Sequence, residues 1–263
     1  MQDGNTIHKV NALELRAPSE DHLDTPFPGR DYRIYIAVTN RCNRHCPFCA
    51  VYSSMEGTSF INLDQISRQV PGKGTFQVQF EGGEPFLHPD IFSFIDTFAS
   101  HPRCSRVIIS TNGSLFPFAM EGNEIDEEKS FEQLKAYFSR LPPVFTLKVS
   151  LNQYLHENDP LLFEKARVLT KFLDETGVEL IFNLRKRNHP RHDQDIHLEE
   201  EVDKHGIRHK TNSFFLQCYG RNSDDENAEK PYLVGTNFIL VNPDGTEWGT
   251  DLVARSEAMG RLK

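Results

Sequence analysis

The sequence has no long apolar run, no excess of basic residues and few cysteines. No stretch of its 263 residues approaches the ~18 apolar residues of a membrane-spanning helix, and Met1 to Arg16 lack the basic-then-apolar order of a secretory signal. The net charge of −9 argues against a protein that coats nucleic acid through its phosphates. We therefore expect a cytoplasmic protein that binds neither membranes nor nucleic acid.

Only five cysteines are present, and in a reducing compartment they are not expected to form disulfides. Cys42, Cys46 and Cys49 form a C-x3-C-x2-C motif, whereas Cys104 and Cys218 stand alone. Three soft thiolates in one loop favour an iron–sulfur cluster that keeps one iron open. The alternative is a zinc loop, which would need a fourth ligand such as His45 or a distant residue.

The hydrophobic pattern alternates between two periods and predicts alternating strands and helices. Strands are expected at 33–38, 75–81, 107–110, 145–151, 178–184 and 212–219, and helices at 62–70, 89–99, 131–141 and 160–176. Strands separated by helices indicate parallel βαβ units. A β-hairpin is expected after them, with strands 237–241 and 246–248 around a turn at 242–245.

The two faces of the expected strands differ in polarity. On strand 75–81, Phe76 and Phe80 share one face, whereas Gln79 and Glu81 share the other, and strands 145–151 and 178–184 alternate similarly. Because burying unpaired polar groups is costly, the polar face must meet a ligand or water. This favours an α/β fold with a partial (β/α)6 open barrel and an internal cavity, over a doubly wound sheet or a filled barrel.

Three parts of the chain are expected. Residues 1–30 show no sustained periodicity and form an N-terminal arm. Residues 31–220 form the partial barrel, and residues 221–263 form a C-terminal extension that contains the β-hairpin.

The cysteine motif follows the first expected strand, and the aromatic Phe48 precedes its last cysteine. Gly82-Gly83-Glu84-Pro85 and Ser110-Thr111-Asn112-Gly113 follow the next two strands. These three segments, in this order, resemble the radical S-adenosylmethionine (SAM) enzymes over about residues 33–219. In that family the Gly-Gly-Glu-Pro segment receives the amino group of SAM, and the S/T-N-G segment lies near SAM.

The resemblance implies that Cys42, Cys46 and Cys49 hold a [4Fe–4S] cluster whose fourth iron binds SAM. Reductive cleavage of SAM then gives a 5′-deoxyadenosyl radical that abstracts hydrogen from the substrate. The SAM contacts that it implies are Phe48, Gly82, Gly83, Glu84, Pro85, Ser110 and Asn112. The glycines let the backbone approach the ligand, and the Glu84 carboxylate or main-chain carbonyls accept from the SAM ammonium.

Two further strand ends supply expected cofactor contacts. Ser150 and Asn152 lie where many family members have S-x-D, although Asn152 departs from that pattern. Asn183 and Arg185 project from the polar face of strand 178–184, and Arg185 can clamp a carboxylate of SAM or of the substrate.

The cysteine loop is locally basic because of Arg41, Arg44 and His45. In an acidic chain such a loop can dock an acidic electron donor such as flavodoxin or ferredoxin, or it can simply be solvated.

Cys218 lies near the end of the sixth expected strand, where two roles are open. It can return a hydrogen atom to a substrate radical, as in radical SAM epimerases, or it can be a buried apolar side chain beside Leu216. Five histidines lie nearby in the sequence and are expected on a solvated helix rather than in a metal site: His189, His192, His197, His205 and His209.

The expected hairpin at 238–245 resembles the start of the family's SPASM or twitch extensions, in which a cysteine soon follows. Here Glu247, Trp248 and Gly249 follow instead, and no cysteine comes after Cys218. We expect a cysteine-free remnant of that extension, which closes the barrel mouth without a second cluster.

The sequence therefore predicts a radical SAM enzyme that acts on a small molecule or short peptide, as in the modification of natural products or peptides. Epimerisation, dehydrogenation, rearrangement and cross-linking all remain open. The alternative is a non-catalytic iron–sulfur or zinc-binding protein with a regulatory or scaffold role. The SAM-facing segments favour the enzyme, because a scaffold does not need them.

Overall fold

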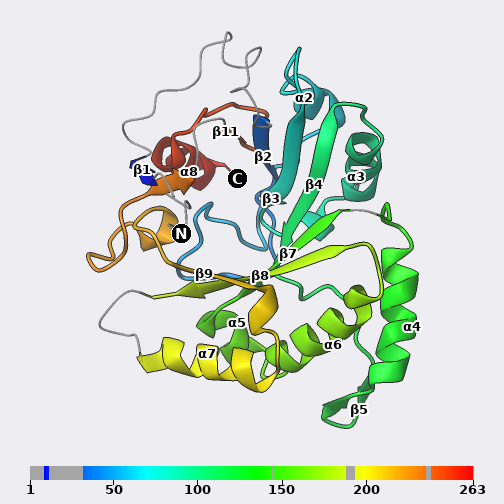
Figure 1. Ribbon diagram of the computed structural model, residues 1–263. Helices are drawn as coiled ribbons and strands as arrows, with labels where there is room; N and C mark the ends of the chain where they lie inside the picture. The colour runs from blue at the N-terminus through cyan, green and yellow to red at the C-terminus, as the bar shows by residue number, and fades with distance from the viewer. Residues whose placement is uncertain (1–8, 12–31, 144, 188–192, 235–237, 263) are drawn as a thin grey trace, which may run out of the picture.

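A seven-stranded sheet with all neighbouring strands parallel forms the centre of the computed structural model (Figure 1). The structure describes residues 9–11, 32–143, 145–187, 193–234 and 238–262. In spatial order the strands are β11 (Phe238–Val241), β2 (Tyr32–Thr39), β3 (Phe76–Gly82), β4 (Cys104–Thr111), β7 (Thr146–Leu151), β8 (Glu179–Lys186) and β9 (Thr211–Phe215). Within the described residues β9 and β11 do not pair, so the barrel is open.

Seven helices accompany this sheet in the described part of the chain. They are α2 (Leu63–Ser67), α3 (Ile91–Ala99), α4 (Glu127–Phe138), α5 (Gln153–Asn158), α6 (Leu162–Asp174), α7 (Asp193–Lys204) and α8 (Leu252–Arg261). Short strands form two small antiparallel pairs, β1 (Lys9–Asn11) with β10 (Tyr232–Val234), and β5 (Met120–Glu121) with β6 (Glu124–Ile125).

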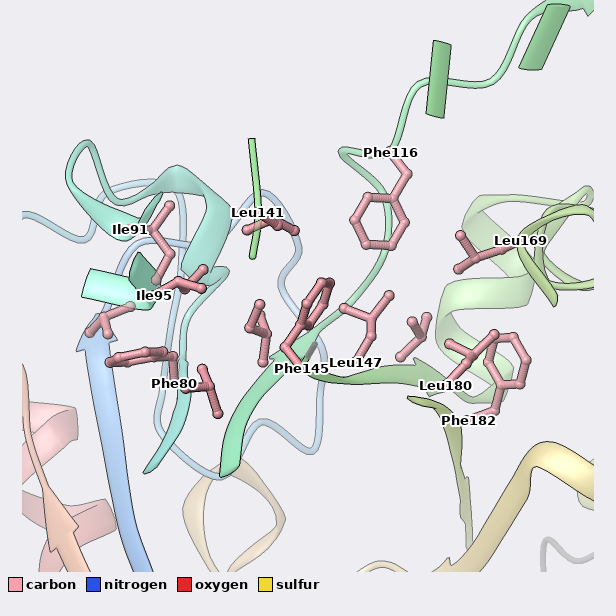
Figure 2. Close-up of a cluster of buried hydrophobic side chains, with 14 of the residues drawn as sticks. Phe80, Ile91, Ile95, Phe116, Leu141, Phe145, Leu147, Leu169, Leu180 and Phe182 are labelled. Atoms are coloured by element: carbon pink, nitrogen blue, oxygen red, sulfur yellow. The ribbon is translucent and has the colours of Figure 1, made fainter. Parts of the chain in front are cut away.

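The main hydrophobic core lies between the apolar face of the sheet and the helices (Figure 2). Figure 2 shows Ile95 of α3 close to Phe80 of β3, and Leu169 of α6 on the side of Leu180 of β8. All four of these side chains are at most 3% exposed. At ~1.5–3 kcal/mol for each fully buried side chain of this size, this layer is a major stabilising contribution to the barrel.

The expected six-stranded partial barrel is confirmed by β2, β3, β4, β7, β8 and β9. The C-terminal hairpin is more closely joined to it than the sequence predicts, because β11 pairs with β2 as a seventh parallel strand. A bridge from Val241 to Glu247 then forms the antiparallel part of the hairpin. Two helices, α5 and α8, are not predicted by the sequence.

Helix α8 packs against the side of β11 and β2 opposite to that covered by the main core (Figure 1). Leu252 at its start contacts Leu240 of β11, and Met259 near its end contacts Ala37 of β2. The helix begins with Asp251, whose side chain accepts a hydrogen bond from the main-chain N–H of Ala254. The C-terminal segment therefore contributes to the interior of the barrel.

Two further expectations concern the N-terminal arm and membrane-spanning helices. Of the N-terminal arm at 1–30, only Lys9–Asn11 belong to the described residues. None of the helices in the described residues is both long and apolar enough to span a bilayer.

Candidate cofactor-binding site

The cysteine motif lies directly after β2, in the loop that leads towards α2. Cys42 is buried, and its main-chain N–H donates to the carbonyl oxygen of Ser54 at 2.8 Å. Cys46 and Cys49 are half-buried and are joined by a hydrogen bond from Cys49 N to Cys46 O at 3.2 Å. All three cysteines line one cavity. The local fold therefore presents three thiols to a common space.

Burial strongly disfavours free thiolates in this loop. Desolvation raises the pKa of Cys42 to about 12 and that of Cys46 to about 11, although Arg185 and Arg221 act to lower the value for Cys46. Without a metal these two groups are thiols at neutral pH. Iron binding must therefore displace protons, so assembly is favoured at higher pH.

A segment far along the chain supports this loop. Arg221, in the 3-10 turn Gly220–Asn222, donates to the carbonyl oxygens of Cys46, Tyr52 and Ser53 at 3.1, 2.9 and 2.9 Å. Its main-chain N–H donates to Cys49 O at 3.0 Å. The chain after β9 thus fastens the cysteine loop, a role that the sequence does not reveal.

Gly83 lies in the second expected SAM-binding segment, where the neighbouring backbone leaves no room for a side chain. A Cβ atom placed there would lie 1.9 Å from the carbonyl oxygen of Arg41. The main-chain N–H of Gly83 donates to Thr39 O at 2.7 Å, and that of Glu84 donates to Arg41 O at 2.8 Å. This segment is therefore packed directly against the start of the cysteine loop. The sequence predicts that the glycines let the backbone approach a ligand, whereas Gly83 is required here by its close packing against Arg41.

Glu84 is fully buried, and its carboxylate is engaged with β4 and the loop after it. Oε1 accepts from Thr111 Oγ1 at 2.7 Å and from Phe86 N at 3.3 Å, and Oε2 accepts from Asn112 N at 2.8 Å. Burial raises its pKa to about 7. Glu84 and Pro85 do not line the cavity, unlike Gly82 and Gly83. Any contact from this segment to an ammonium therefore falls to the main chain of the glycines.

Asn112 connects the third segment to the cysteine loop. Its Nδ2 donates to Asn43 Oδ1 at 2.9 Å and lies 3.7 Å from Cys42 Sγ. Asn43 Nδ2 in turn donates to Ser114 Oγ at 2.7 Å, and Ser114 N donates to Asn112 Oδ1 at 2.9 Å. The ends of β2 and β4 are thereby held in a fixed relation around Cys42.

The cavity is open to solvent and has a volume of about 360 Å³. Twelve residues that the sequence predicts as ligand contacts line it: Cys42, Cys46, Phe48, Cys49, Gly82, Gly83, Ser110, Asn112, Ser150, Asn152, Asn183 and Arg185. The polar strand faces form one part of the wall, as the alternation predicts, and the cysteine loop forms another. Asn152 also caps α5 by accepting from Leu155 N at 2.9 Å, so its Oδ1 is already partnered.

Several lining residues form a hydrogen-bonded row across the strands. Lys148 Nζ donates to Gln79 Oε1 at 2.8 Å, and Gln79 Nε2 donates to Glu81 Oε2 at 2.7 Å. Arg255 Nη1 of α8 donates to Glu81 Oε1 at 2.8 Å. The alternation of the strand places Gln79 and Glu81 on the polar face, but the sequence does not predict that α8 brings Arg255 to Glu81.

Cys218 is not at the cavity wall, although its neighbours Gln217 and Tyr219 are. The sixth strand ends at Phe215 rather than at Tyr219, because the chain turns to pair with Glu229 through a bridge from Gln217 and a hydrogen bond from Cys218 N to Glu229 O at 2.7 Å. The lining offers no support for a hydrogen-donor role of Cys218.

The histidines of the polar segment do not gather at a metal site within the described residues. His197 is exposed beside Glu200, and His205 lies near Glu164 and Glu201. His189 and His192 lie outside the described residues.

The residues present suit an iron–sulfur cluster by the chemistry of the donor set. Three thiols of one loop share a cavity, and soft thiolates are the ligands that iron–sulfur clusters use. Among the described residues no three His, Cys, Asp or Glu side chains are arranged to share one metal ion. The fit therefore rests on the donor set and the common cavity.

Comparison with known sequence families agrees with the motifs. The sequence profile of the Radical SAM superfamily matches residues 36–161, a segment that contains all three cysteines and the Gly82 and Asn112 segments. A solved structure titled "Native anSMEcpe with bound AdoMet" is similar with a TM-score of 0.47 and 14% identity, over 70% of this chain and 52% of that one.

Curated relatives match part of the chain. The GTP 3′,8-cyclase of Chlorobaculum tepidum is 29% identical over 146 residues, which is 46% of this chain and 44% of that protein. The GTP 3′,8-cyclase of Aeromonas hydrophila is 34% identical over 101 residues, 35% of this chain and 30% of that protein. The chain thus matches less than half the length of these relatives.

Proposed function

We propose, on the premise that this chain belongs to the radical SAM superfamily, that it is an enzyme that generates a substrate radical in the cavity of the partial barrel. The cofactors are those of the superfamily, a [4Fe–4S] cluster and SAM. Together they supply a 5′-deoxyadenosyl radical that abstracts a hydrogen atom from the substrate. The observation that carries the proposal is that the three cysteines and the polar strand faces line the same cavity.

The protein's own residues have distinct tasks in this proposal. Cys42, Cys46 and Cys49 would hold the cluster, and Arg221 keeps their loop in place through main-chain carbonyls. The main chain of Gly82 and Gly83 would receive the SAM amino group at the cavity wall. Positioning by a rigid sheet, rather than by side-chain acid–base chemistry, is then the main contribution of the protein.

The substrate in this proposal is a small molecule or a short peptide. The cavity volume supports this size, and the relatives named GTP 3′,8-cyclase support chemistry on small molecules. Epimerisation, dehydrogenation, rearrangement, cyclisation and cross-linking share the initial hydrogen abstraction.

Reduction of the cluster requires an electron donor. Arg41 and His45 are exposed on the cysteine loop, whereas Arg44 turns to the cavity. We propose that Arg41 and His45 help to dock an acidic donor such as flavodoxin or ferredoxin, since opposite charges steer encounter. The five free cysteines favour a reducing compartment such as the cytoplasm.

The C-terminal segment completes the proposal. We propose that residues 221–263 are a cysteine-free counterpart of the family's SPASM or twitch extensions. The hairpin of β11 with Glu247, placed beside β2, supports this. Helix α8 then brings Arg255 to the cavity.

The test is anaerobic reconstitution with iron and sulfide, followed by metal analysis and electron paramagnetic resonance (EPR) before and after SAM is added. We expect about four irons per chain and an EPR spectrum of the reduced cluster that changes with SAM. A protein that takes up zinc in place of iron, or a cluster whose spectrum ignores SAM, would favour the scaffold or zinc alternative instead.

A further inference from the structure

We infer that the cavity contains an anion-binding subsite centred on Arg255 of α8, with Lys148 and Arg185 beside it, and that the substrate carries a carboxylate or phosphate group. This inference deepens the proposed function and rests on it, because it takes the cavity as the place where the substrate binds. Arg185 and Arg255 lie outside the segment matched by the superfamily profile, whereas Lys148 lies within it, so the subsite joins the barrel strands to the C-terminal helix.

The side chain of Arg255 is built into the cavity wall. The residue is 4% exposed, Nε donates to Asn242 Oδ1 at 3.1 Å, and Nη1 donates to Glu81 Oε1 at 2.8 Å. Its Nη2 is buried and has no hydrogen-bond partner among the described residues. A guanidinium fixed on two sides with one unpaired donor is suited to pair with an anion that reaches it from the cavity.

Arg185 is a second incompletely paired cation of the same wall. Its guanidinium lies 5.1 Å from the ring centre of Phe214, and its buried Nε has no hydrogen-bond partner in the described part of the chain. Tyr219 lines the cavity as well and lies within electrostatic range of both Arg185 and Arg255. The Tyr219 phenol is a further hydrogen-bond donor in the same wall.

The charges of the wall favour an anionic ligand. Among the described lining residues the cations are Arg44, Lys148, Arg185 and Arg255, and the one carboxylate is that of Glu81. Glu81 already accepts from both Arg255 and Gln79. The cavity is thus cationic in a protein whose net charge is −9.

Bound cofactors would not cancel this positive charge. An oxidised [4Fe–4S] core carries two positive charges, so that with three thiolates it contributes −1. SAM that binds iron through its amino and carboxylate groups contributes no net charge, because the ligating amine is neutral and the sulfonium and the carboxylate cancel. The remaining −1 of the cluster is smaller than the positive charge of the wall, so cations are still left for a further anion.

Carboxylates and phosphates both suit two guanidiniums and an ammonium, so the probes must separate them. We suggest isothermal titration of the reconstituted, SAM-loaded protein with inorganic pyrophosphate and with succinate, at constant ionic strength. We expect one of the two to bind saturably with one site per chain. Arg255→Gln should weaken that binding about tenfold or more, because a charge-assisted hydrogen bond is lost.

Matched variants separate the subsite from general effects. Arg261→Gln changes an exposed arginine of the same helix and should bind the anion like the wild type. Glu81→Gln removes the competing carboxylate and should strengthen binding severalfold. Because this change acts in the opposite direction, it tests the inference even if Arg255→Gln does not fold.

Four results would overturn the inference. One is that neither anion binds the SAM-loaded wild type saturably. Another is that folded Arg255→Gln binds the anion as the wild type does, or that Glu81→Gln leaves the affinity unchanged. The last is that Arg255→Gln weakens SAM instead of the anion, which would assign Arg255 to the cofactor. Anion binding does not require SAM cleavage, so a protein that binds the anion but never cleaves SAM would refute the proposed function alone.

Discussion

Arg221 donates a hydrogen bond to the carbonyl oxygen of Cys46 across 3.1 Å, although the two residues are 175 positions apart in the chain. The same guanidinium also donates to the carbonyl oxygens of Tyr52 and Ser53. The loop that carries the three cysteines is therefore held in place by the segment that follows β9. The proposed cluster site therefore depends on the loop after β2 and on the turn after β9.

Arg221→Ala should destabilise the protein by about 2–4 kcal/mol, because several partly buried carbonyl oxygens lose their donor. We expect faster loss of iron as well, since the same carbonyls belong to the cysteine loop. Urea unfolding and the time course of iron release measure the two effects. Arg261→Ala, at an exposed position, is the control and should change stability by less than about 0.5 kcal/mol. An equal effect of both substitutions would contradict the role of Arg221.

Gly220→Ala should impair the cysteine loop through a collision. A Cβ atom at Gly220 would lie 2.4 Å from the carbonyl oxygen of Cys49, and φ is +65°. Gly206 is a matched control, because its φ is +68° and nothing lies within 4 Å of the corresponding position. Gly206→Ala should cost only the ~1–2 kcal/mol of the left-handed conformation, whereas Gly220→Ala should also lower the iron content after reconstitution. Full iron loading of folded Gly220→Ala would refute this account.

Glu84 should make stability fall as pH rises. Because burial raises its pKa in the folded protein to about 7, the folded state holds this proton at pH values where the unfolded carboxyl, near 4.5, has lost it. The stabilisation is complete below about pH 4.5 and declines towards pH 7. Between pH 5 and pH 8 the loss should be roughly 2–3 kcal/mol.

Chemical denaturation of the metal-free protein at several pH values measures this contribution. Glu84→Gln cannot ionise and should remove that part of the pH dependence. A variant with the same slope of stability against pH as the wild type would show that Glu84 is ionised in the folded state.

Asn112 should raise the reduction potential of the cluster, because its Nδ2 lies 3.7 Å from Cys42 Sγ and donors to thiolate sulfur stabilise the reduced state. Asn112→Asp removes this donor and adds negative charge, so the potential should become more negative. EPR-monitored redox titration measures the change. Asn43→Ala is the control, since it removes another partner of Asn112 and leaves the contact to Cys42 in place. A potential that shifts equally in both variants would assign the effect to loop packing.

Much of the fold could be predicted because the alternation of apolar and polar residues is strong where one strand face is buried and the other lines a cavity. Gln79 and Phe80 illustrate this, as one faces the cavity and the other the core. The order of the three motifs likewise predicted that Cys42, Gly82 and Asn112 lie together, because the carboxyl ends of parallel strands meet at one edge of the sheet.

The remainder depends on contacts between distant segments, which spacing does not encode. Arg221 reaches Cys46 from the turn that follows β9, and Arg255 reaches Glu81 from α8. The sequence also does not predict that Glu84 accepts hydrogen bonds from Thr111 and Asn112, because a glutamate at a strand end can equally well face a ligand. The sequence pattern predicts that Cys218 belongs to the sixth strand, because nothing in it shows that β9 ends at Phe215.

The most direct test of the central claim is the yield of 5′-deoxyadenosine from SAM after anaerobic reconstitution and reduction with dithionite. Cys46→Ala removes a proposed cluster ligand, whereas Cys104→Ala changes a cysteine that lies on β4 and does not line the cavity. We predict that the wild type and Cys104→Ala release 5′-deoxyadenosine equally and that Cys46→Ala releases none above the protein-free background. Equal yields from Cys46→Ala and the wild type, or no 5′-deoxyadenosine from a wild type with a complete cluster, would contradict the account.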